Sequence, residues 1–229
     1  MSTTNTTTAP ITPNSTLADL AATRAGASRV FYRHDLDFCC HGRISLADAC
    51  AKKRISLDAL VRELEAETAI EPDFRRWDDQ PLAELVQHVL EHFHAPHRAE
   101  LPRLLEMARK VEAVHADKSS CPRGLADHLA RVAEELEMHM QKEEQVLFPM
   151  ILGGRGRSAA MPIHVMEEEH EDHGRNLERL RELTHQFTPP DDACGTWRAL
   201  YLGLHELDAE LMQHIHLENN VLFPRALRS

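Results

Sequence analysis

The sequence lacks the features of a membrane protein, a secreted protein or a nucleic-acid-binding protein. It contains no apolar run of the roughly 18 residues that a membrane-spanning helix needs. Its first segment, MSTTNTTTAPITPNST, lacks the basic start and apolar centre of a secretory signal. The net charge of −11 argues against binding to nucleic acid or to anionic membranes, because both require clustered Lys and Arg. We therefore expect a cytoplasmic protein with neither partner.

Strand signals are also missing, and cysteines are few. The 229 residues include five cysteines, an odd number, and two of them are adjacent. This usage argues against a disulfide framework and fits reduced thiols in the cytosol. No stretch alternates apolar and polar residues over the length of a strand, whereas apolar spacings of three and four residues are frequent. The sequence therefore predicts an all-α protein.

Histidine is the residue in excess, with 14 of its 16 copies after Gln80. Two stretches that carry it are nearly copies of each other: HMQKEEQVLFPMIL from His139 and HIHLENNVLFPRAL from His214. Each places a histidine four residues before a glutamate, Glu143 or Glu218. Residues four apart lie on the same face of an α-helix, so each stretch presents an imidazole beside a carboxylate. Such a pair is half of a metal site.

A second repeat lies upstream of each copy. The segments VLEHFHAPHR and VMEEEHEDHGR align at His94 and His170. His94 precedes His139 by 45 residues, and His170 precedes His214 by 44 residues. The chain therefore contains one helical hairpin twice, and each copy carries a histidine, a long interval and a His-x-x-x-Glu pair.

The sequence predicts four parts. Residues 1–15 form a disordered polar tail. Residues 16–70 form a small helical domain, in which Thr16 and Ser45 are N-caps and a loop displays Cys39 and Cys40. Residues 71–80 are a linker, and residues 81–229 form the main domain.

The main domain is expected to be an up-down four-helix bundle. Its periodic segments, separated by short loops rich in Gly, Pro and Asp, cover approximately residues 81–115, 122–152, 158–186 and 193–227. Short loops require neighbouring helices to run antiparallel. We expect Pro96 and Pro102 to bend or break the first helix, and Pro149 and Pro224 to end helices.

A bundle brings both halves of the repeat to one level and turns them inward. Buried imidazoles and carboxylates cost several kcal/mol each unless something satisfies them, and two metal ions would do so. Four imidazole nitrogens and four carboxylate oxygens supply four donors to each ion if both glutamates bridge. Nitrogen and oxygen ligands without thiolate favour iron or manganese over zinc. Six-coordinate iron would leave room for an oxo or hydroxo bridge and an open position.

The chain resembles the Repair of Iron Centers family, the YtfE and ScdA type of hemerythrin-like di-iron protein. DLDFCCHG resembles the family's N-terminal double-cysteine domain, and HFHAPHR, EELEMHMQKEEQVLFPM, EEEHEDHG and MQHIHLENNVLFPRAL resemble its hemerythrin-like bundle. By position, the resemblance implies that two non-haem iron ions are held by His94, His139, Glu143, His170, His214 and Glu218. Oxygen-carrying hemerythrins use one more histidine.

The resemblance implies a cytosolic stress protein that helps to repair iron–sulfur clusters damaged by nitric oxide or peroxide by donating iron. Its partners would be damaged or apo iron–sulfur proteins, and nitric oxide or a similar small molecule at the iron pair. The alternative is a protein that binds or reduces nitric oxide. A third function, reversible oxygen binding, is disfavoured by the missing histidine and by the added thiol domain. Whether the chain is an enzyme is left open.

Several residues have two interpretations. Glu135 and Glu169 could orient ligand histidines or give iron a route out, or they could be exposed helix acids. Cys39 and Cys40 could hold iron, accept nitric oxide or form a vicinal disulfide, or they could be a structural pair. His97 and His173 could lie behind the ligands or on the surface. We expect surface or packing positions for the histidines that the repeat does not select: His88, His92, His128, His205 and His216.

Overall fold

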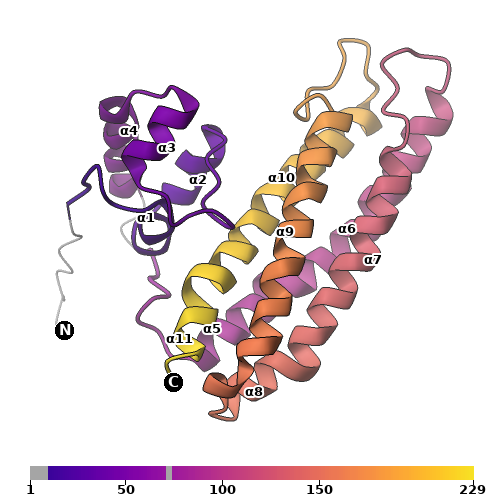
Figure 1. Cartoon of the computed structure of the whole chain (residues 1–229). Coiled ribbons are helices and arrows are strands. Elements are labelled where there is room, and N and C mark those ends of the chain that lie inside the picture. Colours follow the sequence, from indigo (N-terminus) through magenta and orange to yellow (C-terminus); the bar gives the residue numbers. More distant parts are fainter. Residues whose placement is uncertain (1–9, 71–73) are drawn as a thin grey trace. The chain divides into compact units, whose positions relative to one another are not determined.

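The computed structural model of the protein describes residues 10–70 and 74–229 (Figure 1). In this part of the chain all regular secondary structure is helical, apart from one isolated bridge between Thr16 and Ser45. The predicted all-α class is confirmed. Among these residues, no helix is both long enough and apolar enough to cross a membrane.

Backbone contacts divide the described residues into two compact units. The first unit contains residues 10–70 and 74–81 together with Ile215–Pro224, and the second contains Leu82–His214 and Arg225–Ser229. Residues 1–9 of the predicted tail and residues 71–73 of the predicted linker lie outside the described residues. Residues 10–15 of the predicted tail are described, and the Ser15 carbonyl accepts a hydrogen bond from the Leu46 amide at 2.8 Å. The predicted domain boundaries stay predictions.

The first unit begins with four short helices. They are α1 (Leu17–Thr23), α2 (Ala27–Arg33), α3 (Leu46–Lys53) and α4 (Leu57–Ile70). The Thr16 and Ser45 side chains accept from the amides of Asp19 and Asp48, each at 3.1 Å, which confirms both predicted N-caps. The helices surround a core that includes the fully buried Phe31 and Phe38.

A cluster of charges joins α2 to α4. Arg33 Nη2 lies 2.6 Å from Glu63 Oε1 and 2.8 Å from Glu67 Oε1. His34 Nε2 lies 2.6 Å from Glu63 Oε2, and Arg29 contacts Glu67 at 3.2 Å. Hydrogen bonds from His34 and Arg33 lower the pKa of Glu63, and those from Arg33 and Arg29 lower the pKa of Glu67.

Replacing both carboxylates, in Glu63→Gln with Glu67→Gln, is expected to lower the free energy of unfolding at pH 7 by about 1 kcal/mol, because the pairs are partly exposed. A lowered folded-state pKa gives stability that is present above the unfolded value of about 4.3 and is lost as the pH falls through the folded value. The difference between parent and variant should therefore shrink below about pH 4. Urea unfolding at pH 7 and pH 3.5 checks this, with Glu65→Gln as control, since Glu65 is exposed on the same helix. A difference that persists at the lower pH contradicts it.

The second unit contains most of the predicted bundle, and the long helices run side by side in Figure 1. Three of the four predicted segments contain a π-helical turn. The first segment comprises α5 (Leu82–Val89), η1 (Leu90–His94) and α6 (Ala95–Val114). The second comprises α7 (Leu125–Lys142), η2 (Glu143–Leu147) and α8 (Phe148–Leu152). The third is a 3₁₀ turn, η3 (Gly156–Ala159), followed by α9 (Ala160–Leu183). The fourth comprises α10 (Gly195–Leu217), η4 (Glu218–Leu222) and α11 (Phe223–Ala226).

The π turns correct the predictions made for the prolines. Pro149 and Pro224 do not end their helices, because α8 and α11 continue past them, and Pro102 lies inside α6. Before Pro96, Pro149 and Pro224, the amide of the preceding residue bonds five residues back: Ala95 to Leu90, Phe148 to Glu143 and Phe223 to Glu218. Proline lacks an N–H and collides with the carbonyl four residues earlier in a regular helix. A widened turn next to the proline lets the helix continue without that contact.

Candidate metal centre

The six residues selected by the sequence repeat are all buried, with at most 1% of each residue exposed. The structure brings them together in two groups whose ligand atoms lie within 4.8 Å of one another. The groups are His94, Glu143, His214 and Glu218, and His139, Glu143, His170 and Glu218. Both glutamates belong to both groups, so two cations held there would share both carboxylates.

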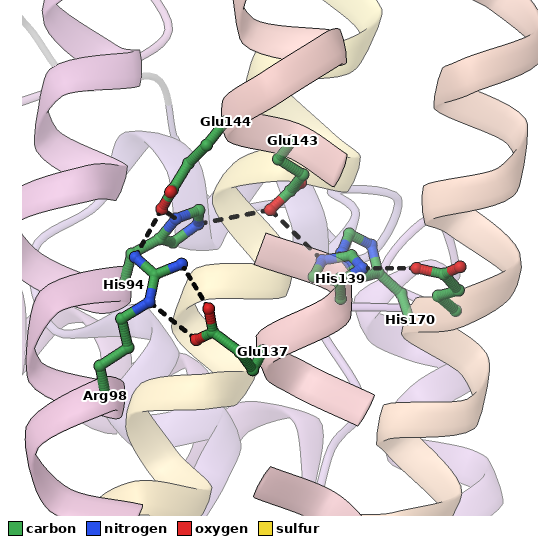
Figure 2. Close-up of polar contacts among 8 residues, drawn as sticks. His94, Arg98, Glu137, His139, Glu143, Glu144 and His170 are labelled. Carbon is green, nitrogen blue, oxygen red and sulfur yellow. Dashed lines mark hydrogen bonds and ion pairs between the residues drawn. The ribbon is translucent and has the colours of Figure 1, made fainter. Parts of the chain in front are cut away.

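Glu143 shows this sharing in its distances. Its Oε2 atom lies 3.3 Å from His94 Nε2 and 3.4 Å from His139 Nε2, as Figure 2 shows. The same Nε2 atom of His139 also lies 3.1 Å from His170 Nε2. Two imidazoles and a carboxylate therefore direct their coordinating atoms at one another in a space that water does not reach.

The π turns place these ligands. His94 is the last residue of η1, Glu143 is the first residue of η2, and Glu218 is the first residue of η4. His170 comes from the regular helix α9. A π turn adds a residue to the helical turn and rotates the side chains that follow, and for this reason such turns are frequent at functional sites. Each of these π turns is followed two residues later by a proline: Pro96, Pro149 or Pro224.

The residues present fit a pair of metal cations. Burying this many imidazoles and carboxylates at one level costs several kcal/mol per group unless opposite charge is supplied. Two divalent cations supply that charge, and mixed nitrogen and oxygen donors suit transition metals of the iron and manganese kind. The assignment of the six residues as ligands stays a prediction that this geometry supports.

Glu144, a carboxylate outside the six residues, orients His94. Glu144 Oε1 accepts from His94 Nδ1 at 2.7 Å and from Arg98 Nη1 at 2.7 Å, and Arg98 Nε donates to Glu137 at 2.8 Å (Figure 2). A hydrogen bond at Nδ1 fixes the tautomer that directs the Nε2 lone pair of His94 inward. Glu144 was not predicted from the sequence, although its position directly after Glu143 was an available signal.

Glu169 and Glu135, the two acids with open roles, have different surroundings. Glu169 Oε2 accepts from His139 Nδ1 at 3.0 Å and also pairs with Lys142. The His139 hydrogen bond and Lys142 lower the pKa of Glu169 to about 2, so this acid stays ionised. The Oε2 atom of Glu135 accepts from Asn176 Nδ2 at 2.7 Å. An effect of either acid on iron release stays a prediction.

The histidines outside the six-residue set have different surroundings. His97 and His173 are buried, which corrects the surface alternative, and burial together with His139 and His170 lowers the pKa of His173 to about 2. His128 is buried as a packing residue, with its Nε2 donating to the Asn176 carbonyl at 2.9 Å. His216 is buried, and its ring packs edge-on to Phe38 with ring centroids 5.5 Å apart.

Cys39 and Cys40 lie between α2 and α3, in a segment from Asp37 to Gly42 that we call the double-cysteine loop. Both are reduced thiols, and their Sγ atoms are 3.7 Å apart. Asp37 Oδ1 accepts from the amides of Cys39 at 3.2 Å and Cys40 at 3.0 Å. The hydrogen bond with Cys40, burial, and the charge of Asp37 raise the pKa of Cys39 well above its usual value. The loop therefore holds Cys39 as a thiol at neutral pH.

Replacing Glu144 by Gln is expected to keep two metal ions per chain but to lower their affinity about ten- to a hundredfold, because the His94 ring loses its charged partner. Competition with a chelator, followed by the rate of metal loss, measures this. Glu134→Gln is the matched control, because Glu134 is exposed on the same helix, and it should release metal at the parent rate. Equal rates for Glu144→Gln and the parent would remove the orienting role.

Comparisons with known proteins agree with this architecture. Residues 85–226 match the family described as Hemerythrin HHE cation binding domain, and residues 13–68 match ScdA_N, described as a domain of unknown function. The iron-sulfur cluster repair protein YtfE of Pectobacterium carotovorum is 50% identical over 212 residues, which cover 93% of this chain and 96% of that protein.

Proteins of the same name in other bacteria are similarly close. The relative in Yersinia pseudotuberculosis is 49% identical over 215 residues, covering 94% of this chain and 97% of the relative. The relative in Musicola paradisiaca is 49% identical over 215 residues, covering 93% and 96%. The match to the hemerythrin family covers more than half of the chain. The chain therefore belongs to the hemerythrin HHE family of cation-binding proteins and, within it, to the group of iron–sulfur cluster repair proteins named YtfE.

Proposed function

We propose that the protein repairs damaged iron–sulfur clusters by donating iron from a pair of non-haem iron ions held by the six buried residues. The observation that carries the proposal is the sharing of Glu143 and Glu218 between two adjacent groups of histidines. The relatives are named iron–sulfur cluster repair proteins, and these names support the same function.

The donor set supports donation rather than permanent retention. The six residues offer at most four histidine nitrogens and four carboxylate oxygens to two ions. Four protein donors per ion leave a six-coordinate cation with open positions, through which an acceptor ligand can enter. When bound, the iron pair would supply ferrous iron as the cargo of the reaction.

Residues around the site orient the ligand histidines. His94 and His139 are held by Glu144 and Glu169, so their rings are set before iron arrives. The basic partners Arg98 and Lys142 keep those carboxylates in place. Damaged or apo iron–sulfur proteins would be the partners, and the cytoplasm, where such proteins are reduced, would be the location.

Iron transfer tests the proposal directly. The full chain is loaded with labelled ferrous iron and incubated with an apo iron–sulfur protein, sulfide and a reductant. We expect labelled iron in the rebuilt cluster of the acceptor, and loss of transfer in a His139→Ala, His170→Ala variant that does not load. Glu134→Gln should transfer at the parent rate. A loaded chain whose iron stays with it in the presence of the acceptor overturns the proposal.

The same loaded chain distinguishes the alternative function. A nitric oxide binding or reducing protein would convert nitric oxide to nitrous oxide, or hold it as a nitrosyl, without loss of iron. Gas analysis and infrared spectroscopy of the loaded chain measure these products. Nitrous oxide turnover with full iron retention would replace donation by nitric oxide reduction as the function.

A further inference from the structure

The two thiols of the double-cysteine loop are spaced for a metal ion. Their Sγ atoms are 3.7 Å apart, well beyond the disulfide bond length of about 2.0 Å. Two thiolates on one tetrahedral ion, each bonded at about 2.3 Å, lie about 3.8 Å from each other. The loop therefore presents both sulfur atoms at the separation that a shared cation requires.

A third donor completes one face of the same site. Asp37 Oδ1 lies 3.3 Å from Cys39 Sγ, and the ligand atoms of Asp37, Cys39 and Cys40 are all within 4.8 Å of one another. An oxygen and a sulfur on a tetrahedral ion lie about 3.6 Å apart when the bonds are about 2.1 and 2.3 Å. The other oxygen, Asp37 Oδ2, is held by His41 Nδ1 at 2.6 Å, which orients the carboxylate.

The loop is held in this shape by contacts inside the first unit. Gly42 allows the tight return of the chain, because a Cβ atom there would lie 2.3 Å from the Phe38 carbonyl oxygen. Asn220 Nδ2 donates to the Cys39 carbonyl at 3.0 Å, and Asn219 Nδ2 donates to it at 3.3 Å. Asn219 follows Glu218 directly in the chain, so the segment that supplies a shared carboxylate also supports the loop.

We infer that Asp37, Cys39 and Cys40 form a third metal site, separate from the six-residue centre, which binds one thiophilic divalent cation. Binding replaces two thiol protons, which pass to solvent, by two metal–sulfur bonds, and the carboxylate adds a third bond. A tetrahedral cation held by these three donors would keep its fourth position for water or another ligand. The site stands on the loop geometry alone, whereas ferrous iron as its natural cation rests on the proposed function.

Cobalt(II) is a suitable probe, because thiolate-to-cobalt charge transfer absorbs strongly in the near ultraviolet and the His and Glu centre contains no sulfur. The full chain, with its thiols kept reduced by a phosphine and its main centre already loaded, is titrated with cobalt(II). We expect the sulfur band to saturate at about one added ion per chain. The same ion should protect Cys40 from alkylation, and a chelator should reverse that protection.

Variants separate the site from the rest of the fold. A Cys39→Ser, Cys40→Ser double variant should lose the band and keep the parent's helical circular dichroism. Asp37→Asn, whose amide oxygen can still accept from both cysteine amides, should bind cobalt about ten- to a hundredfold more weakly. Cys50→Ser removes another buried thiol of the first unit and should leave the titration unchanged.

A folded parent without the sulfur band, or a band that survives in the double variant, overturns the third site. Failure of iron transfer to an acceptor, with the cobalt band present, instead counts against the proposed function and leaves the site standing. Iron transfer by a chain that shows no cobalt band supports the proposed function and counts against the third site. Rapid formation of a Cys39–Cys40 disulfide that cobalt does not slow would also contradict metal binding.

Discussion

Glu143→Gln is expected to reduce the metal content of the chain from two ions to one or none. The side chain keeps its shape, but a neutral amide oxygen cannot balance two cations, and Glu143 Oε2 lies 3.3 and 3.4 Å from the histidines of the two groups. Loss of a saturating ligand at a hundred times its dissociation constant removes about 2.7 kcal/mol of stability. Metal analysis by mass spectrometry, together with thermal unfolding with and without metal, measures both effects.

The contrast with Glu144→Gln makes this prediction specific. Glu144 touches a ligand histidine but belongs to neither group, so its variant should load two ions, only more weakly. Glu134→Gln should load and unfold like the parent. If Glu143→Gln holds two ions per chain with parental affinity, the bridging role of this carboxylate is wrong, and the two groups would have to be independent sites.

Gly42→Ala is expected to destabilise the first unit by about 3 kcal/mol, because the added Cβ would lie 2.3 Å from the Phe38 carbonyl oxygen and 3.0 Å from Ala18 Cβ. The loop has to move, and the Cys39 carbonyl then leaves Asn220. Thermal unfolding and the alkylation rate of Cys39 measure the result. We expect a lower melting temperature and faster alkylation, because Cys39 is buried only while the loop holds its shape.

Gly195→Ala is the matched control for this substitution. Nothing lies within 4 Å of a Cβ atom at Gly195, which is the first residue of α10. Alanine is a better helix former than glycine, so this variant should unfold at the parental temperature or above it. A Gly42→Ala variant that is as stable as Gly195→Ala, with Cys39 still protected, would show that the loop is not tightly constrained.

The helical class and the residues of the candidate centre could be read from local patterns. Residues four apart share a face of any helix, so the stretches from His139 and His214 present a ligand pair whatever their surroundings. Their repetition at nearly equal distances from His94 and His170 selected the same residues that the structure gathers. The N-caps at Thr16 and Ser45 were equally local and are confirmed.

The π turns were not predicted, although their signal was present. Pro96, Pro149 and Pro224 each follow a π turn by two residues, and the helices continue past them. A rule that proline ends a helix assumes regular hydrogen bonds before it. Before these three prolines the hydrogen bonds instead run five residues back, and the widened turn lets the helix continue.

What the sequence by itself determined is therefore periodic and local: an all-α chain, the helix starts at Thr16 and Ser45, and the residues of the candidate centre. Only the tertiary structure decided which outer side chain supports which ligand. Glu144 contacts His94, which is 50 residues away in the sequence, and Asn220 contacts Cys39, which is 181 residues away. Such pairs depend on how each helix is rotated about its axis, and that rotation is set by the packing of whole faces rather than by any short motif.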